Sequence, residues 1–323
     1  MKTFVLPLLL FAACASTPTE LRREAAPGEE TRELDLQRAE QRRRDFQMVL
    51  VKLDQGMESY CRSLAAGSQR ADDEAAKIYK LLHEMVLDIG PQVVTKDTQP
   101  REPGENYRRL QAVAADGSKP EEQKIALAAL GFSGQPEMMP IILQGAQLDH
   151  ANLVDKAVLG LAILRAPTTP PGVLAAIAEN TKLSSESRTQ AAWALHEIQE
   201  VSQQPADIVA IWRRFLTDGK DTLPPGVLVQ AVRGIGLSRD ASLDAVILPF
   251  AKHPVAKIRE ATAVALGRLN GQQHSDLLIA MIGPQEPVPN VRLAARKALQ
   301  ELAGQADYGY DVAAWRKVFE RGR

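Results

Sequence analysis

The sequence lacks most of the features that mark a catalyst, a membrane-spanning protein or a nucleic-acid binder. It has 323 residues, of which only two are cysteines and 5% are aromatic. Its N-terminal apolar run, residues 4–13, is half as long as the roughly 20 residues that a membrane-spanning helix needs. The formal net charge is −1, so no global field attracts nucleic acid. We therefore expect no nucleic-acid partner.

Spacings typical of metal and nucleotide sites are also missing. The five histidines are scattered, with no two of them three or four residues apart, and there is no Cys-x-x-Cys pair. No Gly-x-Ser-x-Gly, Walker-type or Gly-x-Gly-x-x-Gly motif occurs. Acidic groups at 72–74 and 121–122 lie at expected helix starts, where negative charge is favourable. The sequence therefore predicts no catalytic residue, no metal and no cofactor.

The first cysteine ends the N-terminal apolar run. Lys2 and the ten apolar residues suit a signal peptide, and the run closes with Phe11-Ala12-Ala13-Cys14. This ending resembles the lipobox of bacterial lipoproteins, although Phe11 replaces the usual aliphatic residue. The resemblance implies cleavage after residue 13 and lipid attachment to Cys14. The alternative is an ordinary signal peptide in which Cys14 is incidental.

A lipidated Cys14 would determine where the protein works. Several acyl chains on one residue anchor a protein stably, because each buried CH2 contributes about 0.8 kcal/mol. Residues 14–33 have no apolar period and are expected to form a flexible tether. We expect a lipid-anchored protein of the cell envelope that faces the periplasm. Ala15, rather than aspartate, after the cysteine slightly favours the outer membrane by analogy with the known sorting rule.

Residues 34–90 are expected to form a helical hairpin. Apolar residues with gaps of three and four place one stripe on each helix, and residues 65–70 form the turn. The stripes are Phe46, Leu50, Leu53, Met57, Tyr60 and Leu64, then Ala71, Ala75, Ile78, Leu82, Met85 and Ile89. The hairpin is a candidate for oligomerisation or for spacing the rest of the chain from a membrane. Cys61 is expected to be a half-buried core thiol, with a nucleophilic or dimer-forming cysteine as the alternative.

After a linker with a short helix (91–118), residues 119–304 repeat one pattern. The segments "RTQAAWALHEI" (188–198), "REATAVALGRL" (259–269) and "RLAARKALQEL" (292–302) share an arginine followed by a pair of small residues. Across six copies the first small residue recurs at spacings of 31, 34, 40, 31 and 33. These residues are Ala126, Ala157, Ala191, Ala231, Thr262 and Ala295. Such periods predict an array of repeats.

Each repeat is expected to be a helix, a turn and a second helix, which we call the signature helix because it carries the small pair. Prolines and glycines punctuate the helices. Small side chains three residues apart allow neighbouring helices to approach closely. The pattern resembles HEAT-type repeats, including the shorter bacterial HEAT-like class. The resemblance implies an all-α fold, a HEAT-like α-solenoid of stacked helix hairpins preceded by the N-terminal hairpin. Residues 305–323 are similar to closing tails of such proteins, and we expect a capping helix there, with Asp311 at its N-cap.

Two sets of residues are candidates for binding a partner. Arg188, Arg259 and Arg292 occupy one place in three repeats, and Arg233 lies near it in a fourth. Such a ladder would bind an acidic segment, or each arginine would pair with a carboxylate of its own or the adjacent repeat, such as Asp244 or Asp276. Trp193 and Trp212 are either core residues or anchors for a partner.

Two functions remain open at this point. The first is a membrane-anchored extracytoplasmic scaffold that binds an unknown protein or peptide through a concave face made by the signature helices. The second is an enzyme or an enzyme accessory subunit, since some HEAT-like repeat proteins resemble bilin lyases or accompany hydroxylases. We favour the scaffold because it needs no catalytic group.

Overall fold

The computed structural model describes residues 29–66, 68, 70–87 and 104–320. The predicted signal peptide, Cys14 and most of the tether lie outside the described residues. The chain divides into two compact units, residues 1–48 and 49–323, and the boundary lies within the first helix. In the first unit, residues 31–45 of this helix are all exposed. None of the described helices is long and apolar enough to cross a membrane.

The described residues are helical, as the periodicity predicts, and the unit 49–323 is an all-α repeat array. The N-terminal hairpin consists of α1 (Glu29–Ala65) and α2 (Arg70–Leu87). The first helices of the repeats are α3 (Glu105–Ala115), α5 (Met139–Ala146), α7 (Pro171–Glu179), α9 (Pro205–Thr217), α11 (Asp244–Ile247) and α13 (Ser275–Ile282). The signature helices are α4 (Pro120–Gly131), α6 (Ala151–Leu164), α8 (Ser185–Gln199), α10 (Pro225–Ser238), α12 (Ala256–Arg268) and α14 (Pro289–Leu302).

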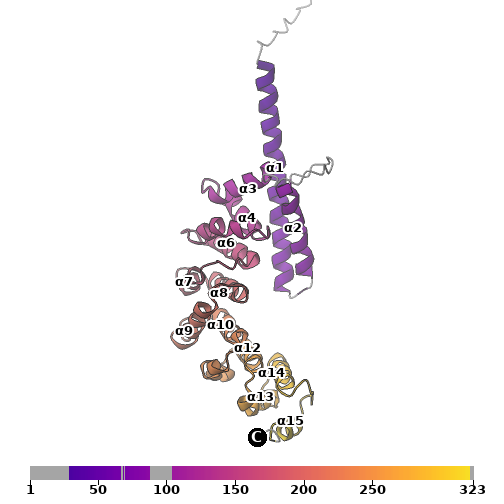
Figure 1. Ribbon diagram of the computed structural model, residues 1–323, viewed down its shortest axis with the longest axis vertical. Coiled ribbons are helices and arrows are strands. Elements are labelled where there is room, and N and C mark those ends of the chain that lie inside the picture. The colour runs from indigo at the N-terminus through magenta and orange to yellow at the C-terminus, as the bar shows by residue number, and fades with distance from the viewer. Residues whose placement is uncertain (1–28, 67, 69, 88–103, 321–323) are drawn as a thin grey trace, which may run out of the picture. The chain divides into compact units, whose positions relative to one another are not determined.

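The signature helices form one layer and the first helices form the other (Figure 1). Each signature helix packs against the signature helices before and after it, and against the first helix of its own repeat. The small residues make this possible. A Cβ on Gly131 would lie 2.4 Å from the carbonyl oxygen of Gly160, so α4 and α6 meet backbone to backbone. The array begins with α3, which the sequence placed in a linker but which packs on α4 and α5.

One expected helix is broken. A continuous first helix is expected in every repeat, but in the fifth repeat the structure has three short turns instead: the 3-10 helices 241–243 and 248–252 flank the four-residue α11. Pro249 lies in this segment and has no N–H to donate to a preceding turn. The segment still buries Leu243, Ile247 and Phe250, so its packing role in the repeat is kept.

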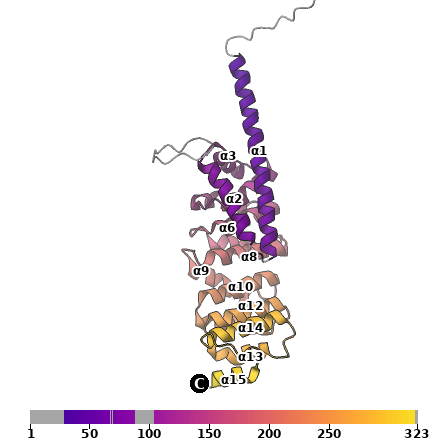
Figure 2. The same cartoon turned by 90° about the vertical axis from the view of Figure 1, so that its right-hand side faces the viewer.

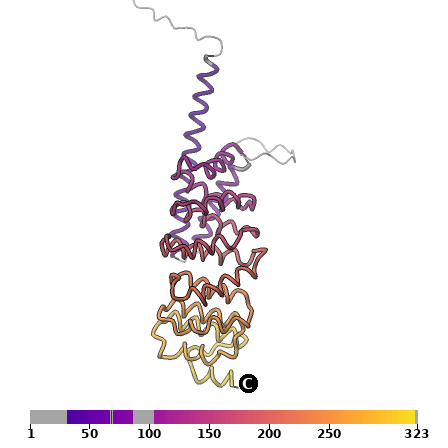
Figure 3. The backbone as a smooth tube through the Cα atoms, turned by 90° about the vertical axis from the view of Figure 1, so that its left-hand side faces the viewer, coloured from indigo at the N-terminus to yellow at the C-terminus, as the bar shows by residue number. Residues whose placement is uncertain are grey.

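The hairpin of the unit 49–323 lies along the signature-helix layer (Figures 1 and 2). Most of its predicted stripe is buried, but Leu64 is exposed, Ala75 is half-buried and Ile89 lies outside the described residues. Tyr60 packs edge-on against Phe132 at the end of α4, with ring centroids 5.1 Å apart. The tube drawn from the opposite side shows the layer of first helices free of the hairpin (Figure 3). From residue 49 onward, the hairpin therefore covers the signature helices of the first repeats and belongs to the same compact unit as the array.

The last described helix, α15 (Val312–Glu320), closes the array by packing on α13. The Asp311 carboxylate accepts hydrogen bonds from the backbone N–H groups of Ala313 and Ala314 at 2.9 and 3.0 Å, as an N-cap residue does. Trp315 is fully buried, and its indole N–H donates to the carbonyl of Gly309 at 3.0 Å. The helix thus covers apolar surface that the last repeat would otherwise leave open.

Candidate partner-binding face

Three of the four candidate arginines tie one helix of a repeat to the other. The guanidinium groups of Arg188 and Arg292 donate from Nε to the carbonyls of Ala178 and Ile282, at 2.8 and 3.1 Å. Arg259 donates from Nη1 to the carbonyls of His253 and Pro254, at 2.9 and 3.1 Å. In each repeat these carbonyls lie at or just beyond the end of the first helix, where backbone acceptors have no partner within the helix. These contacts hold the helical hairpin of each repeat closed.

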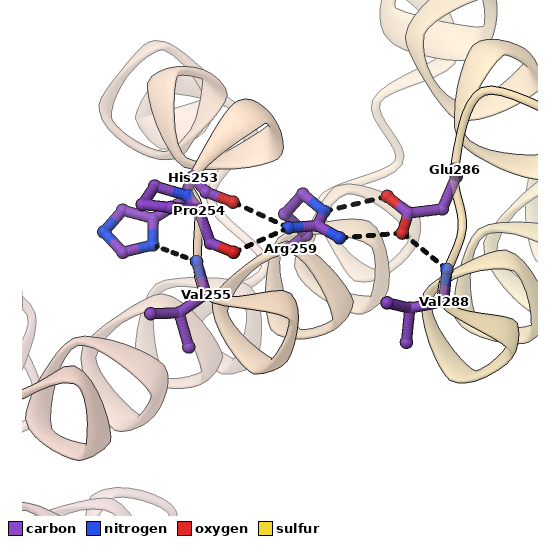
Figure 4. A network of polar contacts seen from close by, with 6 residues as sticks. All are labelled: His253, Pro254, Val255, Arg259, Glu286 and Val288. Carbon is purple, nitrogen blue, oxygen red and sulfur yellow. Dashed lines mark hydrogen bonds and ion pairs between the residues drawn. The ribbon is translucent and has the colours of Figure 1, made fainter.

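Arg259 also binds the next repeat (Figure 4). Its Nε and Nη2 atoms donate to the two carboxylate oxygens of Glu286 at 2.8 and 2.7 Å, which is a bidentate pair. Glu286 also accepts from the backbone N–H of Val288 at 3.0 Å. The hydrogen bonds from Arg259 hold the pKa of Glu286 below its ordinary value. The pair links α12 to the loop before α14.

The carboxylate that pairs with Arg259 is not one of those expected from the sequence. Asp244 instead lies 2.7 Å from Nε2 of His274 and accepts from the Gln273 amide at 2.8 Å. Glu286 lies 27 residues after Arg259, in the loop that leads to the next signature helix. Sequence spacing gives no sign of this pair, because loop geometry decides which carboxylate reaches the guanidinium.

Arg233 differs from the other three arginines. It lies five residues further along its signature helix than the place that Arg188, Arg259 and Arg292 share, and the described residues provide no hydrogen bond or ion pair for it. It is half-buried and lines a groove of about 410 Å³ between the N-terminal parts of α8, α10 and α12. The groove is lined by Thr189, Pro225, Gly226, Val229, Gln230, Arg233, Val255 and Lys257. Among the four candidates, Arg233 alone presents an unpartnered guanidinium.

The two candidate tryptophans have different environments. Trp212 is fully buried in α9, and its indole N–H donates to the Gln199 side chain at 2.8 Å. Gln199 in turn donates to the carbonyl of Gly234 at 2.8 Å, and a Cβ at position 234 would lie 2.1 Å from the indole nitrogen. Trp212 is therefore a core residue. Trp193 is half-buried on α8. The pKa of the neighbouring Glu197 is lowered mainly by a hydrogen bond from His196, and a hydrogen bond from Trp193 makes a smaller contribution.

Equivalent positions in the six signature helices show where the layer is open. We call the residue two places after the first small residue the outward position. In α4 and α6 it is Ala128 and Leu159, with 0% and 3% of their surface exposed. In α8, α10 and α12 it is Trp193, Arg233 and Val264, which are half-buried, and in α14 it is Lys297, which is exposed. The hairpin lies over the first two repeats and ends level with α8, so α8 marks the boundary and the layer is free of the hairpin beyond it (Figures 1 and 2).

The hairpin places Cys61 close to the covered part of this layer. Burial raises the pKa of the half-buried Cys61 thiol, and the charge of Lys156 on α6 offsets only part of this effect. Burial likewise raises the pKa of the neighbouring Tyr60 to about 12. A raised thiol pKa lowers the fraction of thiolate, which is the nucleophilic form. The environment of Cys61 therefore suits a packing residue better than a nucleophile.

Comparisons with known proteins assign no family to the chain. No protein-family model matches the chain, and no curated protein matches it. The complex of CpcE and CpcF of phycocyanin lyase from Nostoc sp. PCC7120 is 16% identical, with a TM-score of 0.44, over 72% of this chain and 99% of the other. An engineered protein from the Northeast Structural Genomics Consortium is 15% identical, with a TM-score of 0.44, over 61% of this chain and 96% of the other. At these values neither similarity indicates a function.

Proposed function

We propose that this protein is a membrane-anchored, extracytoplasmic HEAT-like repeat scaffold that binds a protein or peptide through its signature-helix layer. The binding face would be the open part of the layer, from α8 to α14. We call it the open face, and define it by the outward positions Trp193, Arg233, Val264 and Lys297. The observation that supports it is the change at the outward position from buried in α4 and α6 to accessible in α8 to α14.

The contacts of the arginines support this choice of surface. Tryptophan and arginine are the side chains most often found at the centres of binding interfaces. Arg188, Arg259 and Arg292 are occupied in joining helices, whereas Arg233 and the half-buried Trp193 stand at equivalent positions of adjacent repeats. We therefore place Arg233 and Trp193 in the binding face, and Arg188, Arg259, Arg292 and Trp212 in the framework that supports it.

Site-specific photo-cross-linking in the native envelope tests this function. A photoreactive residue at Val264 is expected to capture one protein reproducibly, whereas the same residue at Arg213, which is exposed on α9 in the other layer, is not. Equal capture from both layers, or no capture at Val264, would contradict binding through the open face.

The anchor is a separate part of the proposal and has its own test. Mass spectrometry of the purified protein should find Cys14 as the N-terminal residue and carrying acyl chains. Cys14→Ser should release the protein from membranes. A bare Cys14 would remove the anchor and leave the binding face untouched, because the two rest on different residues. Fractionation of the membranes would also decide between the inner membrane and the slightly favoured outer membrane.

The alternative of an envelope enzyme or enzyme accessory subunit depends on Cys61 as its nucleophile. Cys61→Ser should leave function intact if the residue only packs, since the two side chains differ little in size. Loss of function with unchanged folding would favour the enzyme. Sizing the soluble chain with and without residues 15–104 would test whether the hairpin drives oligomerisation. A monomer mass in both cases would exclude it.

A further inference from the structure

The open face carries a charge pattern that the covered part lacks. Helical spacing places four positions of each repeat on the same stripe as the outward position: five before, one before, two after and six after the first small residue. In α10, α12 and α14 these twelve positions hold four cations, Arg233, Lys257, Arg268 and Lys297, and one carboxylate, Glu301. In α4, α6 and α8 they hold three carboxylates, Glu121, Glu186 and Glu197, and one cation, Lys156. The layer thus changes from acidic to basic along the array.

Few of the four cations are neutralised within the described structure. Lys257 lies 3.1 Å from Glu260 on its own helix, but this pair is largely exposed and contributes little. Arg233, Arg268 and Lys297 have no ion pair among the described residues. Three cations without an ion pair, against the single carboxylate Glu301 on the same face, make this face complementary to an acidic partner.

Apolar side chains lie between these cations. The outward positions include the half-buried Leu237 of α10 and Val264 of α12, and Trp193 stands next to them on α8. A partner segment that matches this surface needs both carboxylates and apolar side chains. The groove of about 410 Å³ beside Arg233 has room for a carboxylate side chain against the guanidinium.

The N-terminal hairpin shows which kind of secondary structure packs on this layer. In the first repeats the layer is covered by α2 and by α1 from residue 49 onward (Figure 2). Most of the stripe residues of these helices are buried, and Tyr60 packs against Phe132 at the end of α4. The open face continues the same layer beyond the end of this hairpin. An amphipathic helix therefore fits the layer by a precedent within the molecule.

We propose that the face formed by α10, α12 and α14 docks an acidic amphipathic helix of a partner protein, with a partner carboxylate paired to Arg233. This inference rests on the proposed binding function and specifies its chemistry. Pairing with a carboxylate gives Arg233 the counter-charge that it lacks in the structure. Lys257, Arg268 and Lys297 draw the remaining carboxylates to the face.

Binding of a defined probe tests the chemistry. The full-length protein in detergent is titrated into a fluorescently labelled synthetic amphipathic peptide with leucines on one face and glutamates on the other. A matched peptide has lysine in place of every glutamate. We expect the glutamate peptide to bind, the lysine peptide not to bind, and the affinity to fall in high salt. Equal binding of both peptides, or of neither, would overturn the proposal.

A charge-reversal pair locates the binding. The double variant Arg233→Glu and Lys297→Glu should weaken the glutamate peptide about tenfold or more, which corresponds to roughly 1.4 kcal/mol. The control Arg213→Glu and Lys220→Glu changes the net charge equally at exposed positions outside the signature helices and should leave the affinity unchanged. Equal effects of both variants would show that only net charge matters and would overturn the assigned face. Thermal melting of both variants verifies that they fold.

Cross-linking distinguishes a failure of this chemistry from a failure of the proposed function. The segment captured at Val264 in the native envelope is identified by mass spectrometry and should be acidic and amphipathic. A captured protein segment that is neutral or basic would overturn the acidic helix and leave the scaffold function in place. Capture of lipid alone, or of nothing, would overturn both.

Discussion

The two halves of the signature-helix layer differ in whether another part of the same chain covers their outer surface. In α4 and α6 the outward positions are Ala128 and Leu159, and a helical hairpin of the same chain lies over them. In α10, α12 and α14 the same positions hold Arg233, Val264 and Lys297, which no element of the described chain covers. Burial at one register position thus distinguishes the part of the layer that lies under the hairpin from the part that we propose binds a partner.

Polar ties join neighbouring repeats in both halves, as Arg165 with Glu200 does at the ends of α6 and α8, but the halves differ in what is added to them. Where the hairpin lies over the layer, apolar contacts such as that between Tyr60 and Phe132 add to the packing of the repeats. In the open half, Arg259 and Glu286 join consecutive repeats through a bidentate ion pair. Polar ties of this kind keep the layer rigid without adding apolar surface to a face that must stay exposed.

The most direct test of this difference places the same charge at the outward position of each half. Leu159→Asp puts a carboxylate under the hairpin and should destabilise the protein by more than about 3 kcal/mol, because burying an unpaired charge is costly. The matched change Val264→Asp, at the half-buried outward position of α12, should cost less than about 1 kcal/mol. Chemical denaturation of both variants measures the difference. Similar losses would mean that the hairpin does not close the layer.

Removing the aromatic contact of the hairpin should have the next largest effect. Tyr60→Ala deletes a buried ring packed on Phe132 and should cost about 3 kcal/mol, as large-to-small core changes do. Hydrogen exchange of α4 and α6 should quicken while that of α12 and α14 stays the same. The control Val51→Ala removes an exposed apolar side chain from α1 and should change neither. Uniform acceleration along the whole array would contradict local closure by the hairpin.

The ion pair of the open half is expected to contribute less. Glu286→Gln keeps the side-chain shape but removes the charge that Arg259 binds, and should cost about 1 to 2 kcal/mol at pH 7. Because the folded-state pKa of Glu286 is lowered, its contribution is present above the ordinary glutamate pKa and is lost as the pH falls through the lowered value. The stability gap between wild type and variant should therefore close in acid. A gap that persists in acid would show that charge is not the cause.

The smallest expected effect is on thiol chemistry in the covered half. Because burial raises the pKa of Cys61, alkylation of the native protein at neutral pH should be slower than that of a free peptide thiol. Tyr60→Ala should speed the reaction by loosening the hairpin. Measuring the rate against pH gives the thiol pKa directly. A rate above that of the peptide thiol would return Cys61 to the list of candidate nucleophiles.

Sequence periodicity was sufficient to predict the helices and their stacking, but not which part of the signature-helix layer is covered. The gaps of three and four predicted the hairpin helices, and the small pairs predicted six stacked signature helices, because both patterns record local burial. The position of the hairpin on the layer depends on contacts between distant segments, such as Tyr60 with Phe132, which leave no spacing to recognise. The broken helix at Pro249 shows that a proline can outweigh a periodic apolar pattern.

The candidate arginines fall into two groups, those whose position is explained by the fold and the one that is left without a partner. Arg188, Arg259 and Arg292 recur at one place in the repeat because they satisfy carbonyls at the end of each first helix, so their recurrence reflects the fold. Arg233 departs from the repeated place, and this departure leaves it unpartnered in a groove. A residue that breaks a repeat pattern was thus the better signal for a binding surface than the residues that keep it.

The closing helix α15 has a consequence for how the protein associates with itself. Trp315 is completely buried at the end of the array, where it packs edge-on against Tyr308 with ring centroids 5.0 Å apart. A chain cut at Gly304 would leave that end as bare apolar surface, able to accept the first repeat of another molecule. Through repeated head-to-tail contacts of that kind such chains would grow into filaments. We therefore expect the buried Trp315 to prevent end-to-end association of one array with the next.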